Sequence, residues 1–146
     1  MEETVYESSL ISATVPDGWM AFPGADFFKN YPDEPGDPHV IRIHKGAANE
    51  WDQFTTPGLQ INYTESDRPM TVLKDVNRDV KDLDPIMIGD AVWQGFSAVS
   101  AEVPLIVLWM TKPHQIQIFI WPDMEKGSIL LEEADVQMII RSIQIK

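Results

Sequence analysis

Three strand-like runs follow one another in the C-terminal half of the chain, and this succession constrains the fold more than any other feature. They cover residues 91–99, 103–111 and 115–121. β-Branched and aromatic residues are frequent in them, and the breaks between them are only a few residues long, as between hairpin strands. The runs therefore predict neighbouring antiparallel strands of one sheet.

The break at Lys112-Pro113 gives the tightest of these turns. Taking these two residues as the centre of the turn fixes the register of the hairpin. The facing pairs expected are Val107 with Ile118, Leu105 with Ile120, Leu108 with Gln117, Ile106 with Phe119, and Pro104 with Trp121. Both faces of the 103–111 strand are then apolar, which predicts a central strand covered on both sides. We expect Val107, Ile118 and Ile120 in the core.

Other strand signals are shorter. Strand-like stretches occur at Val5, Ile11–Val15 and residues 39–45, and the 59–64 segment alternates apolar with polar side chains. Such alternation indicates a strand with one buried face. The 23–38 segment contains six proline and glycine residues, a density that excludes a helix or a central strand. It predicts a long surface loop.

Two segments have the spacing of amphipathic helices. The clearer one spans residues 70–83, with start signals at Asp67 and Pro69 and a stop signal at Pro85. Its apolar residues are Val72, Leu73, Val76, Val80 and Leu83. The second spans residues 131–142, and its apolar stripe consists of Val136, Ile139, Ile140 and Ile143.

A short helix over residues 47–54 completes the expected elements. Strands, helix, strands and helix in this order predict an α+β fold, with amphipathic helices packed on an antiparallel β-sheet. The chain has 146 residues, the usual size of one domain. We therefore expect a single α+β domain over residues 1–146.

Two short motifs and this layout carry a family resemblance. Val15-Pro16-Asp17-Gly18-Trp19 closes an early strand, and Ile140-Arg141-Ser142-Ile143 ends the last helix. Together with the order of elements, they resemble the PsbP-like superfamily, which includes the photosystem II extrinsic subunit P, a Ran-binding nuclear transport factor and many bacterial domains. The resemblance implies a bacterial accessory or binding protein, and some bacterial relatives look like chaperones for secreted effector proteins.

Composition narrows the classes of partner. The chain has 11 Lys and Arg against 23 Asp and Glu, a net charge of -12, which disfavours nucleic acid and anionic membrane surfaces. It has no cysteine, so disulfides, thiol nucleophiles and thiolate metal sites are excluded. Its start does not resemble a signal peptide, and the longest apolar run, Val103–Met110, is too short to cross a bilayer. We expect a soluble cytoplasmic protein; an exported or lipid-anchored protein with its leader removed is the alternative.

The acidic segment at residues 33–39 is the strongest candidate for metal or catalytic chemistry. Asp33, Glu34, Asp37 and His39 offer oxygen ligands that suit calcium. The spacing does not match a calcium-binding loop, so we expect a solvated acidic loop without a metal or cofactor. No nucleophile elbow, catalytic triad or phosphate-binding glycine loop occurs in the sequence.

Aromatic residues provide the remaining candidate site. Phe119 and Trp121 share a predicted strand face with Gln115 and Gln117, as on a sheet face that is partly covered. We predict Trp121, Phe119, Gln117 and Trp93 as partner-binding residues; the alternative is a second small core closed by the proline-rich loop or the 47–54 helix. The leading hypothesis is a non-enzymatic binding or accessory domain that recognises another protein and has a chaperone-like role. The alternative is a small hydrolase or ligand-binding protein that uses the acidic loop.

Overall fold

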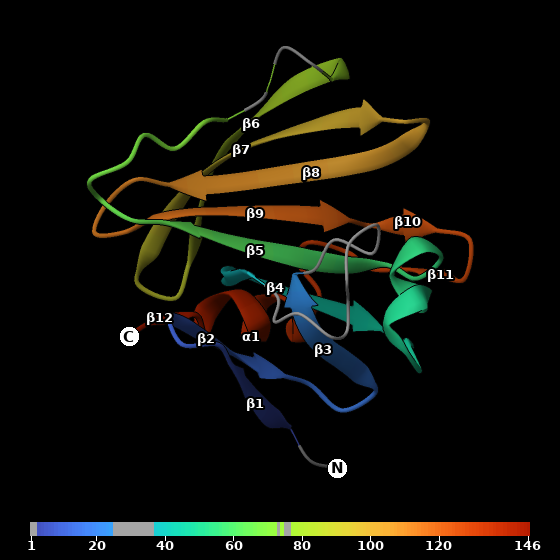
Figure 1. Ribbon diagram of the computed structural model, residues 1–146. Helices are drawn as coiled ribbons and strands as arrows, with labels where there is room; N and C mark the ends of the chain where they lie inside the picture. The colour runs from blue at the N-terminus through green and yellow to red at the C-terminus, as the bar shows by residue number, and fades with distance from the viewer. Residues whose placement is uncertain (1–2, 25–36, 73, 75–76) are drawn as a thin grey trace.

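The chain is built mostly of β-strands (Figure 1). The structure, a computed structural model, describes residues 3–24, 37–72, 74 and 77–146. Seven antiparallel strands form a large sheet in the order β3-β4-β5-β9-β8-β7-β6. Their bounds are Trp19–Gly24 for β3, Asp37–Lys45 for β4, Gly58–Thr64 for β5, Arg78–Ile88 for β6, Ala91–Ser100 for β7, Val103–Met110 for β8 and Gln115–Trp121 for β9.

A three-stranded sheet and helix α1 (Ala134–Arg141) lie against one side of this large sheet, which we call the first face (Figure 1). The three-stranded sheet contains β1 (Thr4–Glu7), β2 (Ile11–Val15) and β12 (Gln144–Ile145), and α1 contacts both β2 and β6. A short hairpin joins β10 (Asp123–Met124) to β11 (Gly127–Ser128), and a 3₁₀ helix, η1, spans Glu50–Phe54.

The main core lies between the first face, β2 and α1. Its fully buried side chains include Ile11, Ile41, Ile43, Leu59, Ile61, Leu108, Ile118, Ile120 and Ile139. These residues alternate along their strands, so every second side chain of β4, β5 and β9 enters this core. The other side chains form the second face of the large sheet.

The expected α+β fold is wrong, because most elements are strands and the second half of the expected 70–83 helix belongs to a strand. Residues 78–88 are strand β6, paired with β7 through a two-residue turn at Gly89 and Asp90. Gly89 has φ +62°, which the turn requires and which favours glycine. Pro85 is tolerated because β6 is an edge strand and its register shifts between Leu83 and Ile86. Pairing with β7 therefore outweighs the helical spacing of the apolar residues. Two of those residues, Leu73 and Val76, lie outside the described part of the chain.

The predicted hairpin register is also wrong, by one residue. Val107 pairs with Phe119, and Leu108 pairs with Ile118. Residues 111–114 connect β8 to β9, and the pairs are centred on Pro113 rather than between Lys112 and Pro113. A one-residue shift exchanges the faces of a strand. Val107, Ile118 and Ile120 are all buried as expected, but Val107 lies on the second face and the two isoleucines lie on the first.

Other predictions had mixed outcomes. The five strand segments at 39–45, 59–64, 91–99, 103–111 and 115–121 are confirmed within a residue or two, and β8 is a central strand. The 131–142 helix is confirmed as the shorter α1, and the predicted 47–54 helix is η1. Most of the 23–38 loop lies outside the described residues, while its ends belong to β3 and β4. In the described part, no helix has the length and apolar character needed to cross a membrane.

Candidate functional site

The second face of the large sheet changes from polar to apolar across its strands. A row of paired residues runs through Arg42 on β4, Gln60 on β5, Phe119 on β9, Val107 on β8 and Phe96 on β7. Because paired residues point to the same side of a sheet, these side chains are neighbours. The row places one cation and one amide beside a group of apolar side chains.

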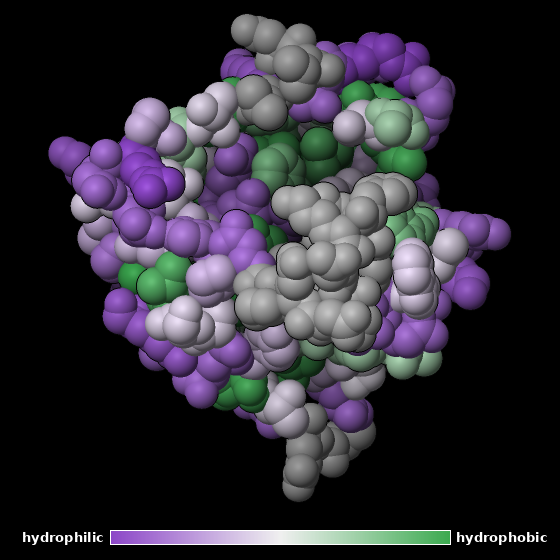
Figure 2. Space-filling view, viewed as in Figure 1, coloured by the Kyte–Doolittle hydropathy of each residue, from purple (hydrophilic) through white to green (hydrophobic). Residues whose placement is uncertain are grey.

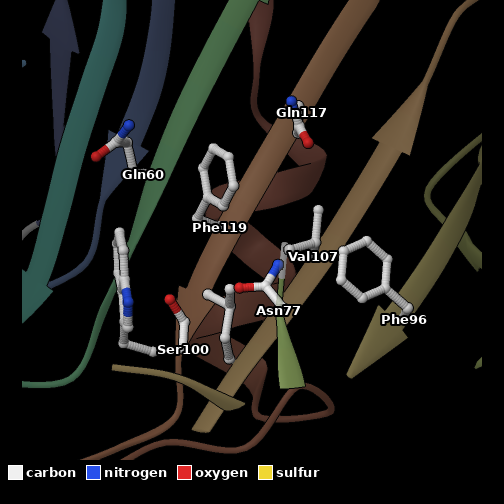
Figure 3. Close-up of a pocket in the computed structure, with 9 residues that line it drawn as sticks. Gln60, Asn77, Phe96, Ser100, Val107, Gln117 and Phe119 are labelled. Carbon is white, nitrogen blue, oxygen red and sulfur yellow. The ribbon is translucent and has the colours of Figure 1, made fainter. Parts of the chain in front are cut away.

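A hollow of about 290 Å³ lies on this face, and we call it the aromatic pocket. It is lined by Gln60, Asn77, Phe96, Ser100, Leu105, Val107, Gln117, Phe119 and Trp121. Figure 3 shows the labelled side chains rising from neighbouring strands around one space. In Figure 2 the hollow opens over β8 and β9, with apolar atoms visible inside it. The pocket is therefore apolar inside, with amide and hydroxyl groups around it.

Burial divides the pocket into a floor and a rim. Phe96 and Val107 are buried and belong to a small second core with Ala98 and Leu105. Phe119 and Trp121 pack against that core but remain partly exposed, with their ring centroids 6.3 Å apart and their planes at 25°. Two partly exposed aromatic rings thus form part of the rim.

Gln117 provides a polar group inside the pocket. It is only 6% exposed, and its Nε2 donates to the Thr71 carbonyl oxygen at 3.1 Å. Its Oε1 is buried and has no hydrogen-bond partner among the described residues. A buried acceptor without a donor costs free energy. A ligand N–H that reached Gln117 Oε1 would remove that cost.

Arg42 and His44 flank the pocket beside Trp121. The Cζ atom of Arg42 lies 5.0 Å from the centroid of the Trp121 ring, within the range of a cation–π contact. Burial lowers the pKa of Arg42 to about 10, so the guanidinium is charged at neutral pH. His44 is fully buried between Phe22 and Trp121, and burial together with the Arg42 charge lowers its pKa to about 4. It is therefore neutral.

The structure brings together three of the four predicted partner-binding residues. Gln117, Phe119 and Trp121 alternate along β9 and line the aromatic pocket. Trp93 does not join them, because it is 2% exposed and lies in the main core on the first face. It borders a separate cavity of about 750 Å³ between the β6–β7 turn and α1.

Sequence reasoning missed several residues of the site. Val107 and Leu105 were assigned to the opposite face because the hairpin register was shifted by one residue. Phe96 and Gln60 reach the pocket from β7 and β5, and no sequence signal placed β5 beside β9. A connection centred on Pro113 would have corrected the β8 error. Arg42 carried a weak signal, as a cation between two isoleucines in the middle of a predicted strand.

The acidic segment forms a different arrangement. His39 Nδ1 lies 2.7 Å from Asp37 Oδ1, and its Nε2 contacts Glu65 Oε1. The hydrogen bond to Glu65, followed by the one to Asp37, raises the pKa of His39. Each ring nitrogen therefore faces one carboxylate. His44, five residues further along β4, points to the other face of the sheet. Among the described residues no group of His, Asp and Glu is placed to hold a metal ion; Asp33 and Glu34 lie outside them.

Two comparisons with known proteins found no relative of this chain. No family model matches the chain, and no curated protein matches it. The similarity to the PsbP-like superfamily therefore stays a prediction from the sequence. Function must be inferred from the site itself.

Proposed function

We propose that this protein is a non-enzymatic binding domain that holds a partner protein by one apolar side chain in the aromatic pocket. The observation that carries this proposal is the partial exposure of Phe119 and Trp121 beside a hollow with an apolar floor. Partly exposed aromatic residues with a polar surround are typical of protein interfaces. The predicted resemblance to a superfamily of docking and accessory proteins favours the same function.

The size of the pocket favours a side chain over a cofactor. Sites for drug-sized ligands usually enclose about 300–1,000 Å³, and the aromatic pocket, at about 290 Å³, lies at the lower limit. One aromatic or branched aliphatic side chain suits this volume.

A displayed peptide library selected on the purified protein tests this function. We expect enrichment of peptides that share one aromatic or large aliphatic residue. Binding of these peptides should be lost in Gln60→Trp, which places an indole into the pocket from its β5 side. Gln94→Trp is the matched control, because Gln94 is exposed on β7, pairs with Trp109 on the same sheet face and does not line the pocket.

Comparison of the two substitutions separates the loss of the aromatic pocket from the general effect of adding an indole to this sheet face. Peptides that bind wild type and Gln94→Trp equally, but not Gln60→Trp, support the aromatic pocket. Equal binding to all three proteins places the binding surface elsewhere and contradicts the proposal. Failure to enrich any peptide with an apolar anchor also contradicts it.

A further inference from the structure

Arg42 differs from the other cationic residues of the described part of the chain. Several of those residues form ion pairs with carboxylates, namely Lys45, Lys74, Arg78 and Lys146. The others, which lack an ion pair within the described residues, are exposed to water, namely Arg68, Lys81, Lys112, Lys126 and Arg141. Arg42 is only partly exposed, and within the described residues it has no ion pair. Its Nε is shielded from solvent without a hydrogen-bond partner there.

An unpaired cation in this position is costly. Removing a charge from water is unfavourable unless an opposite charge or hydrogen bonds compensate it. The contact with the Trp121 ring compensates only in part, because a cation–π interaction contributes roughly 0.5–2 kcal/mol. The chain has 23 Asp and Glu residues, yet no described carboxylate pairs with Arg42. The missing counter-charge is therefore expected from a bound partner.

The position of Arg42 connects this charge to the aromatic pocket. Arg42 pairs across β4 and β5 with Gln60, and its guanidinium lies over Trp121. Gln60 and Trp121 both line the pocket. The β4 and β9 backbones are two strand spacings apart, about 10 Å, and the Arg42 side chain reaches over part of that distance. One residue of an extended peptide spans roughly 3.3 Å, so a carboxylate one or two residues from an anchor in the pocket would meet Arg42.

We propose that Arg42 determines the specificity of the aromatic pocket by binding an Asp or Glu side chain next to the apolar anchor of the partner protein. This inference rests on the proposed function and names the chemistry of the segment bound there. The partner segment contains an apolar residue with a carboxylate one or two positions away. Its charge is satisfied by Arg42.

Two short peptides test the inference without altering the protein. One has a central Phe flanked on each side by two Glu residues, and the other has Gln in place of every Glu. Both are acetylated and amidated, so that neither carries a terminal charge. Binding is followed by chemical shift changes of the Gln60 and Gln117 side-chain amides. We expect the Glu peptide to bind at least about tenfold more tightly, the effect of one hydrogen bond to a charged group.

Protein variants assign that preference to Arg42. Arg42→Met keeps much of the side-chain volume and removes the charge, so it should bind the two peptides equally. Arg141→Met is the matched control, since Arg141 is exposed at the end of α1, and it should keep the preference. Arg42→Met should also unfold at a temperature no lower than wild type, because it replaces a partly shielded cation that has no ion pair within the described residues by an apolar side chain.

The possible results distinguish a failure of the Arg42 assignment from a failure of the proposed function. If both peptides bind wild type equally and Gln60→Trp binds neither, Arg42 is not a specificity residue, while the proposed function stands. If neither peptide binds wild type, both proposals are contradicted. A preference for Glu that persists in Arg42→Met overturns the assignment to Arg42.

Discussion

Acidification should destabilise the protein through one buried histidine, His44. Its ring is fully buried between Phe22 and Trp121, at centroid distances of 5.6 and 6.3 Å. Nδ1 lies 3.0 Å from the Thr56 carbonyl oxygen, so this nitrogen carries the proton of the neutral ring. Burial, followed by the positive charge of Arg42, lowers the pKa of His44 from 6.5 to about 4. Protonation of the folded protein is therefore strongly disfavoured.

The size and sign of the effect follow from this difference in pKa. In the unfolded chain His44 takes up a proton near its ordinary pKa, whereas the folded protein resists protonation until about pH 4. Between these values the unfolded state binds more protons, so the free energy of unfolding falls as the pH falls. One pKa unit corresponds to about 1.4 kcal/mol, and the contribution lost across the window is roughly 3 kcal/mol.

Urea unfolding at a series of pH values, followed by tryptophan fluorescence, measures this loss. His44→Gln removes the titrating group and should flatten the pH dependence between pH 6.5 and about pH 4. The substitution lowers stability at all pH values, so the slope with pH is the quantity compared. His114→Gln, at an exposed histidine in the β8–β9 connection, should keep the wild-type slope. Equal slopes in wild type and His44→Gln, or an NMR titration of the His44 ring near its ordinary pKa, would refute the reasoning.

Three further predictions concern packing and the acidic cluster. Gly58→Ala should lower the free energy of unfolding by about 1–3 kcal/mol, because the new Cβ would lie 2.5 Å from His44 Cγ and 2.6 Å from the Ile43 carbonyl oxygen; wild-type stability in chemical denaturation would contradict this. Ile118→Ala should cost about 2–5 kcal/mol, since Ile118 is fully buried, and a loss well below that range would show that the core closes around the cavity. NMR titration should place the pKa of His39 above 6.5, and Glu65→Gln should lower it. The stability that this ion pair contributes is complete below the pKa of His39 in the unfolded chain and is lost as the pH rises through its pKa in the folded protein. A His39 pKa at or below 6.5 would contradict this contribution.

Local patterns were sufficient for most of the strands and for α1. Alternation in the 59–64 segment predicted β5, because one face of that strand is buried in the main core. The apolar stripe of Val136, Ile139 and Ile140 predicted α1, since the same stripe packs on β2 and the large sheet. The shared face of Gln117, Phe119 and Trp121 was also predictable, because side chains two residues apart on a strand point to the same side.

Tertiary structure decided what local patterns left open. Residues 78–88 have a helical spacing of apolar side chains, yet they form β6 because the Gly89-Asp90 turn brings them against β7. Because the β8–β9 pairs are centred on Pro113 rather than between Lys112 and Pro113, Val107 lies on the second face and Ile118 on the first. Strand order placed Arg42, Gln60 and Phe96 around the same β9 residues. Sequence by itself determined which side chains share a strand face; the pairing of distant strands, which depends on contacts across the whole sheet, determined which faces meet to form the aromatic pocket.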